Sequence, residues 1–106
     1  MNFLRRIEPK ASAYGFIESN LSHDELEALF NDVDANRTER SLLRLVNATQ
    51  GITTKTIRDL ACKSAPYRKR VLNEKLRHYG YQLICLPPAP ALAAWSWFLI
   101  KDKDNE

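Results

Sequence analysis

The stretch PYRKRVLNEKLRHYGYQLICLP, residues 66–87, decides the fold. Its first part has helical spacing, and the arc of that helix which must face a core holds Leu72, Leu76 and Tyr79. Gly80 ends the helical pattern, and the residues that follow are rich in the types that favour strands. We therefore expect a helix over 66–79 that is followed at once by a strand over 81–87.

Two helices are expected upstream of this stretch, each opened by a capping box. In the first, we expect the Ser22 hydroxyl to accept from the Glu25 N–H and the Glu25 carboxylate to accept from the Ser22 N–H. Asn36 and Glu39 have the same spacing and predict the second capping box. The second helix should end near Gly51. The segment ITT, residues 52–54, is long enough only for a bridge or stub strand. A short third helix is expected to run through TKTIRDLACKS, residues 54–64, with these residues turned inward: Ile57, Leu60 and Ala61.

A second strand is expected in AWSWFLI, residues 94–100, which would form a hairpin with the strand over 81–87. Alternation places Trp95, Trp97 and Leu99 on one face of this strand, and Phe98 with Ile100 on the other. Each of the two apolar faces must be buried against other residues. Either the N-terminal segment around residues 14–17 or a second subunit could supply the additional cover, and the sequence leaves both open.

The chain has 106 residues, which fits one domain, and we expect a mainly α fold with a small β-hairpin, in the α+β class. No apolar run approaches the ~18 residues that span a bilayer. The opening MNFLRRIEPK has no apolar segment behind its charges, so no secretory signal is visible. We therefore expect a cytoplasmic protein, without a membrane partner, in which Cys62 and Cys85 are thiols.

The expected order is helix, stub strand, short helix, turn, helix and hairpin, which is the winged helix-turn-helix arrangement. The run LNEKLRHYGYQL, residues 72–83, resembles the recognition helix and first wing strand in the winged-helix DNA-binding domains of response regulators. WSWFLI, residues 95–100, is similar to their second wing strand. The resemblance covers residues 38–101 and implies binding to double-stranded DNA. The connector PPAPALAA, residues 87–94, departs from the family because it has no Lys or Arg for a wing-tip contact.

Charge is distributed unevenly along the chain. Residues 1–53 carry six basic and eight acidic side chains, whereas residues 54–106 carry ten basic and five acidic ones. A basic half of this kind indicates one face that meets a polyanion. We expect the helix over 66–79 to enter the major groove and the preceding segment to hold the DNA backbone. The candidate DNA-binding residues are Thr53, Thr54, Lys55, Arg58, Lys63, Tyr67, Arg68, Lys69, Arg70, Asn73 and Arg77.

The chain divides into three parts in this interpretation. Residues 1–35 form an N-terminal appendage and first helix for docking or dimerisation, residues 36–101 the winged-helix domain, and residues 102–106 a solvated tail. The hypothesis is a small stand-alone transcriptional regulator that binds double-stranded DNA. A homodimer through the N-terminal segment or the aromatic hairpin remains open. Two alternatives are a protein–protein interaction module and a phage or mobile-element factor for replication, recombination or anti-defence.

Other chemistry finds little support in the sequence. Residues 32–43 begin like a calcium loop, but Arg37 stands where the loop needs Gly and Leu43 where it needs Glu. Only His23 and His78 accompany the two cysteines, and none of them has metal-site spacing. With three glycines in the chain there is no phosphate-cradling motif. We expect no catalytic residues, no metal and no cofactor, and a protein that is not an enzyme.

Overall fold

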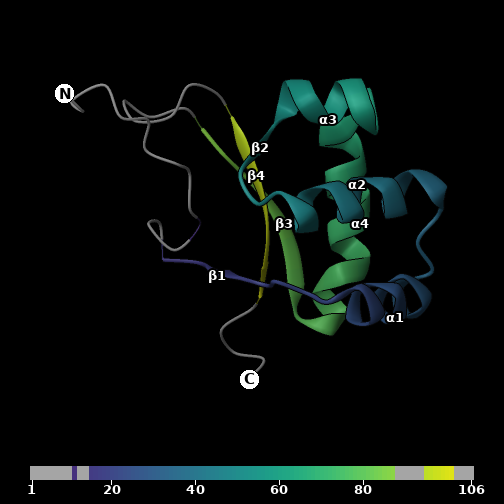
Figure 1. The fold of residues 1–106 in the computed structure, drawn as a ribbon. Coiled ribbons are helices and arrows are strands. Elements are labelled where there is room, and N and C mark those ends of the chain that lie inside the picture. The colour runs from purple at the N-terminus through teal and green to yellow at the C-terminus, as the bar shows by residue number, and fades with distance from the viewer. Residues whose placement is uncertain (1–10, 12–14, 88–94, 102–106) are drawn as a thin grey trace.

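The computed structural model describes residues 11, 15–87 and 95–101, which form a small α+β domain. The helices lie on one side of an antiparallel sheet (Figure 1). A 3₁₀ turn, Arg77–Tyr79, continues the last helix. The helices are α1 (His23–Val33), α2 (Arg37–Ala48), α3 (Thr54–Leu60) and α4 (Ala65–Leu76), and the strands are β1 (Ile17–Glu18), β2 (Ile52–Thr53), β3 (Tyr81–Leu86) and β4 (Ser96–Lys101).

Both predicted capping boxes are present and confirm the starts of α1 and α2. The Ser22 hydroxyl accepts from the Glu25 N–H at 3.2 Å, and Glu25 accepts from the Ser22 N–H at 2.9 Å. The Asn36 side chain pairs with Glu39 in the same reciprocal way. These contacts satisfy backbone donors that have no partner inside the helix. The second helix ends at Ala48, earlier than the Gly51 expected from sequence.

β4 is the centre of the sheet. It pairs with β3 along its whole length on one side, from Tyr81↔Lys101 to Leu86↔Ser96. On its other side β1 and β2 share one edge, with Glu18 opposite Ile100 and Ile52 opposite Trp97. The expected hairpin partners and the stub strand are therefore confirmed, whereas β1 is an additional strand.

A side-chain amide fills the gap between β1 and β2. The Gln50 Oε1 accepts from the Leu99 N–H at 2.9 Å, and its Nε2 donates to the Leu99 carbonyl at 3.1 Å. Asn47 holds both backbone groups of Leu21 in the same manner. We call these contacts amide clamps. Each pairs two backbone groups with a single side chain and so satisfies polar groups that would be costly to leave buried and unpaired.

The two apolar faces expected of β4 are both buried. Trp97 and Leu99 join the main core against the helices, together with Leu72 and Leu76 of α4. Phe98 and Ile100 pack on the opposite face with residues that include Ala11 and Phe16 of the N-terminal segment. Part of the second cover therefore comes from the chain itself. Residues 1–10, 12–14, 88–94 and 102–106 lie outside the described residues, and with them nearly all of the connector between β3 and β4, the expected tail and part of the expected N-terminal appendage.

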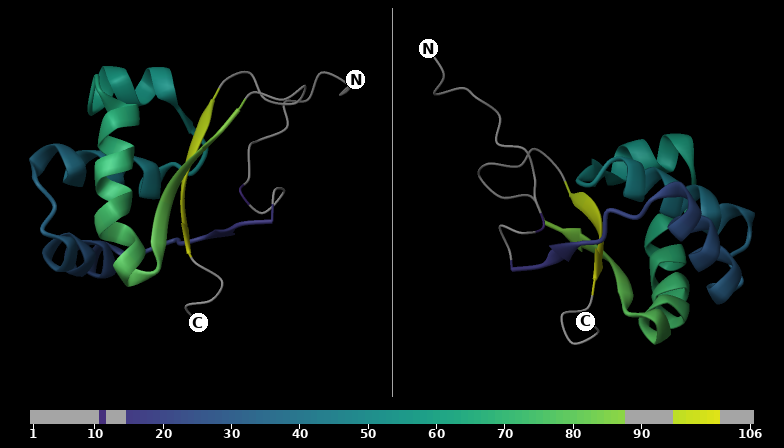
Figure 2. Two further views of the ribbon diagram at one scale, coloured as in Figure 1. Left: turned by 180° about the vertical axis from the view of Figure 1, so that it is seen from behind. Right: turned by 60° about the horizontal axis from the view of Figure 1, so that its bottom comes forward.

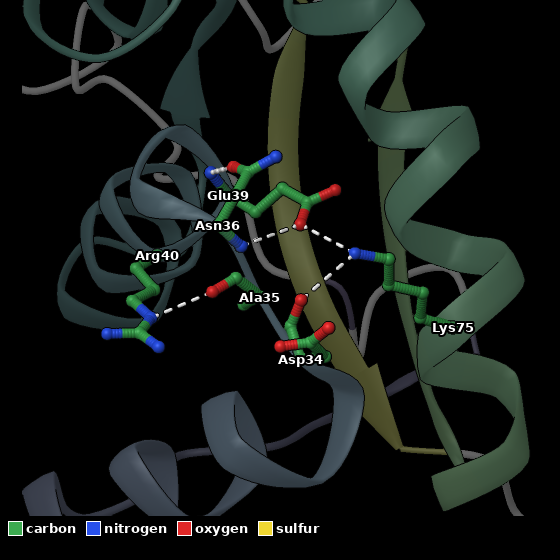
Figure 3. Close-up of polar contacts among 6 residues, drawn as sticks. All are labelled: Asp34, Ala35, Asn36, Glu39, Arg40 and Lys75. Carbon is green, nitrogen blue, oxygen red and sulfur yellow. Dashed lines mark hydrogen bonds and ion pairs between the residues drawn. The ribbon is translucent and has the colours of Figure 1, made fainter.

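A buried carboxylate joins α2 to α4 (Figure 3). The Glu39 side chain is fully buried, and the Lys75 ammonium lies 2.9 Å from its Oε1. The same ammonium donates to the Asp34 carbonyl at 3.2 Å, at the left-handed residue that ends α1. Three helix ends therefore meet at Lys75.

Three side chains expected in the core are exposed instead. Leu60 is 69% exposed because α3 ends at this residue, and Trp95 is 50% exposed because it precedes β4. Tyr79 is 42% exposed. The α-helical spacing placed Tyr79 inward, but the chain tightens to a 3₁₀ turn after Leu76, which rotates residue 79 away from that arc.

Candidate nucleic-acid interface

The outer face of α4 and the 3₁₀ turn that follows it carry several of the candidate residues. Tyr67, Arg70 and Arg77 are exposed, while Leu72 and Leu76 on the opposite face are fully buried. The view from behind shows α4 running beside β3 (Figure 2). Apolar anchoring on one face thus presents the basic residues on the other.

A hollow of about 620 Å³ lies between α4 and β3. Its α4 side is basic, with Lys69, Arg70 and Arg77, and Gln82 of β3 contributes to the lining. Glu74 is the acidic residue of this lining, and its carboxylate lies 3.4 Å from the Arg77 guanidinium. The hollow is therefore a basic groove in which Glu74 is the one carboxylate among the described lining residues.

Tyr67 stands at the start of α4 between two guanidinium groups. The Arg68 group lies 5.6 Å and the Arg70 group 6.0 Å from the centre of its ring. Such cation–π contacts hold the two arginines near the aromatic ring. Arg68 is half-buried and its Nε has no hydrogen-bond partner among the described residues, whereas Arg70 is exposed.

A second hollow, of about 400 Å³, adjoins the first. It lies between α3 and the start of α4 and is lined by residues that include Arg58, Asp59 and Lys63. Pro66 lines both hollows, so the two form one continuous surface. This surface collects exposed cations from α3, from the turn and from α4.

Asn73 was predicted to contact bases, but its amide already has two partners. Its Oδ1 accepts from the Leu83 N–H at 2.7 Å, and its Nδ2 donates to the Leu83 carbonyl at 2.9 Å. Asn73 is thus a third amide clamp, which joins α4 to β3. It lines the floor of the groove without presenting a free amide to a ligand.

Other predicted contact residues support the fold around the surface. The Thr53 hydroxyl caps α3 by accepting from the Thr56 N–H at 3.2 Å, and the Thr54 hydroxyl accepts from the Trp97 indole at 2.7 Å. Lys55 pairs with Asp59 on the outside of α3. The Lys69 ammonium lies 5.7 Å from the centre of the Trp97 ring, so Lys69 covers the main core as well as lining the groove.

Four residues that line the two hollows were not among the sequence-based candidates: Asp59, Pro66, Glu74 and Gln82. Gln82 was missed because nothing in a strand pattern shows that it reaches a groove beside α4. Glu74 was left out because its charge is opposite to that of the basic candidates on the same helix.

Both cysteines are free thiols, as expected. Cys62 is buried with its Sγ 3.6 Å from the Ser64 hydroxyl, and Cys85 is half-buried beside Thr54. Burial raises the pKa of the Cys85 thiol, which the contact with Thr54 and the charge of Lys69 partly offset. No group of three or more His, Cys, Asp or Glu side chains that could hold a metal occurs within residues 11, 15–87 and 95–101.

Within the described part of the chain, no helix combines the length and the apolar composition needed to cross a bilayer.

Comparisons with known proteins identify no family for this chain. No protein-family model, no curated protein and no solved structure matches the chain significantly.

Proposed function

We propose that the protein is a winged helix-turn-helix protein that binds double-stranded DNA in a sequence-specific manner. The connectivity supports this fold: α2, β2, α3, α4, β3 and β4 follow one another in this order. β2 and β3 pair with opposite edges of β4, and a four-residue turn, 61–64, links α3 to α4. In this fold the second helix of the pair, here α4, is the one that enters the major groove.

The observation that carries the proposal is the single basic surface over α3 and α4. Arg70 and Arg77 point outward from α4, and arginine recognises guanine through two hydrogen bonds in the major groove. Arg58 and Lys63 line the adjoining hollow, where they would neutralise backbone phosphates. The major groove is ~12 Å wide, which is enough to accept an α-helix with its side chains.

The structure changes which residues we assign to this contact. Arg58, Lys63, Tyr67, Arg70 and Arg77 remain the proposed contact residues. Thr53, Thr54 and Asn73 are instead proposed to hold the surface in place, because their side chains bond within the fold. The biological role that we propose is transcriptional regulation by a small DNA-binding protein.

Fluorescence anisotropy with a labelled duplex that carries a site selected from a random pool, compared with an unselected duplex, tests the proposal. Arg70→Ala and Arg77→Ala should each weaken binding by about tenfold, with unchanged circular dichroism. Arg37→Ala is the matched control, because Arg37 is an exposed arginine on α2 that does not line either hollow. Wild-type protein that fails to bind a duplex at ~50 mM salt would overturn the proposal and favour a protein partner.

A further inference from the structure

Glu74 is the residue of the basic groove whose charge opposes binding to a polyanion. It lies on the same outward face of α4 as Arg70 and Arg77, and its side chain is 68% exposed. A carboxylate at this position repels phosphate wherever the helix meets DNA without regard to sequence. A ligand that offers a hydrogen-bond donor at this point would offset that penalty.

The contact between Glu74 and Arg77 can be replaced by contacts to a ligand with little loss of free energy. The two groups are 3.4 Å apart, three residues apart on one helix, and both are about 70% exposed. Exposed pairs of this kind contribute little to stability, on the order of 0–1 kcal/mol. Both side chains are therefore available to a ligand when one enters the groove.

The Glu74 carboxylate is a hydrogen-bond acceptor, and it lies beside the Arg77 guanidinium, which is a hydrogen-bond donor. In the major groove, cytosine presents an amino donor and its partner guanine presents two acceptors. A carboxylate accepts from the cytosine amino group, and arginine donates to guanine. The pair on α4 is thus chemically complementary to a C·G base pair.

We propose that Glu74 determines the specificity of the interface by requiring a cytosine at the position it faces, with Arg77 on the partner guanine. This inference rests on the proposed binding to duplex DNA. The carboxylate favours the correct base and weakens binding elsewhere, which is how a specific interface rejects wrong partners. Glutamine at the same position would remove the charge and would favour adenine instead.

Selection of duplexes from a random pool, carried out with wild type and Glu74→Gln, tests the inference. The wild-type site should contain a C·G pair whose replacement by T·A weakens binding about tenfold. With Glu74→Gln, this preference should be lost or change to adenine, the other preferences should remain, and a random duplex should bind several times more tightly. Glu27→Gln is the control, because Glu27 also pairs with an arginine, Arg44, but lies on α1 outside the groove.

The outcomes separate the two proposals. If wild type binds duplex DNA but the selected site is unchanged by Glu74→Gln, or has no sequence preference at all, the role of Glu74 is wrong while duplex binding stands. If Glu27→Gln alters the site as strongly as Glu74→Gln, the effect comes from net charge and the role of Glu74 is again wrong. If wild type binds no duplex at low salt, both proposals fail.

Discussion

The Asn73 side chain in α4 bonds both backbone groups of Leu83 in β3, accepting from its N–H at 2.7 Å and donating to its carbonyl at 2.9 Å. Leu83 is 1% exposed, so these backbone groups have little access to water. The contact also fixes the position of α4 along the sheet. A residue that was predicted to contact DNA thus holds the proposed recognition helix in place.

Replacing Asn73 by alanine should reduce the free energy of unfolding by about 2 kcal/mol, because two buried backbone groups lose their partner. Urea denaturation measures the change. Asn73→Asp should also destabilise, since a carboxylate cannot donate to the Leu83 carbonyl. Variants as stable as wild type, but with weaker duplex binding, would restore the original assignment of Asn73 to base contact.

Gln50→Ala should destabilise through the same mechanism at the opposite edge of the sheet. The Leu99 N–H loses its partner, whereas the Leu99 carbonyl keeps a bond from the Ser19 N–H at 3.0 Å. We expect a loss of about 1 kcal/mol, smaller than that for Asn73. Amide hydrogen exchange should show faster exchange at Leu99 than in wild type, and unchanged exchange there would contradict the clamp.

Lys75→Met should destabilise by about 3 kcal/mol, because it leaves the buried Glu39 carboxylate without its counter-charge. In a Glu39→Gln background the same substitution should cost much less, since no buried charge remains. Chemical denaturation of the four variants forms a double-mutant cycle that isolates this pair. Additive effects would mean that the two residues act independently.

The capping box of α1 predicts how the stability of the fold changes as the pH falls. The Ser22 backbone N–H, and after it the Ser22 side chain, hold the pKa of Glu25 below its usual 4.5. Since this pKa is lowered by folding, Glu25 stabilises the fold above pH 4.5, and the benefit is lost as pH falls through the lowered value. Ser22→Ala should raise the pKa of Glu25 and weaken the cap by about 1 kcal/mol. Carboxyl titration by NMR checks this, and an unmoved pKa would count against it.

Lys63→Ala should weaken duplex binding without removing the sequence preference, because Lys63 is proposed to contact phosphate and not bases. The slope of log affinity against log salt should become shallower by about 0.9. Binding measured from ~50 to ~200 mM salt gives this slope. A changed selected site would instead place Lys63 on a base.

Local sequence signals predicted the parts of the fold that local chemistry controls. The capping boxes at Ser22 and Asn36 depend on residues three apart, and the two faces of β4 follow from alternation. β1 was missed because two residues give no pattern, and its partner Ile100 is far along the chain. The end of α3 at Leu60 was missed as well, so an apolar side chain expected inside is exposed.

In the candidate interface too, local spacing predicted some residues correctly and missed those whose partners lie on other elements. Helical spacing predicted that Arg70 and Arg77 face outward, because burial of Leu72 and Leu76 determines the orientation of α4. The roles of Asn73 and Lys75 could not be predicted in this way. Their partners, Leu83 and Glu39, lie on other elements, and a polar residue in a helix has the same sequence pattern whether it contacts solvent or a neighbouring strand.

The amide clamps also have a consequence for how copies of this protein behave at high concentration. An open strand edge is a template on which another chain can add a strand and begin aggregation. β1, the Gln50 amide and β2 together occupy one edge of β4, and the Asn73 amide occupies the middle of β3. Loss of the Asn73 amide would free backbone groups on the outer edge of β3, so we expect Asn73 to limit strand pairing between molecules as well as to stabilise the fold.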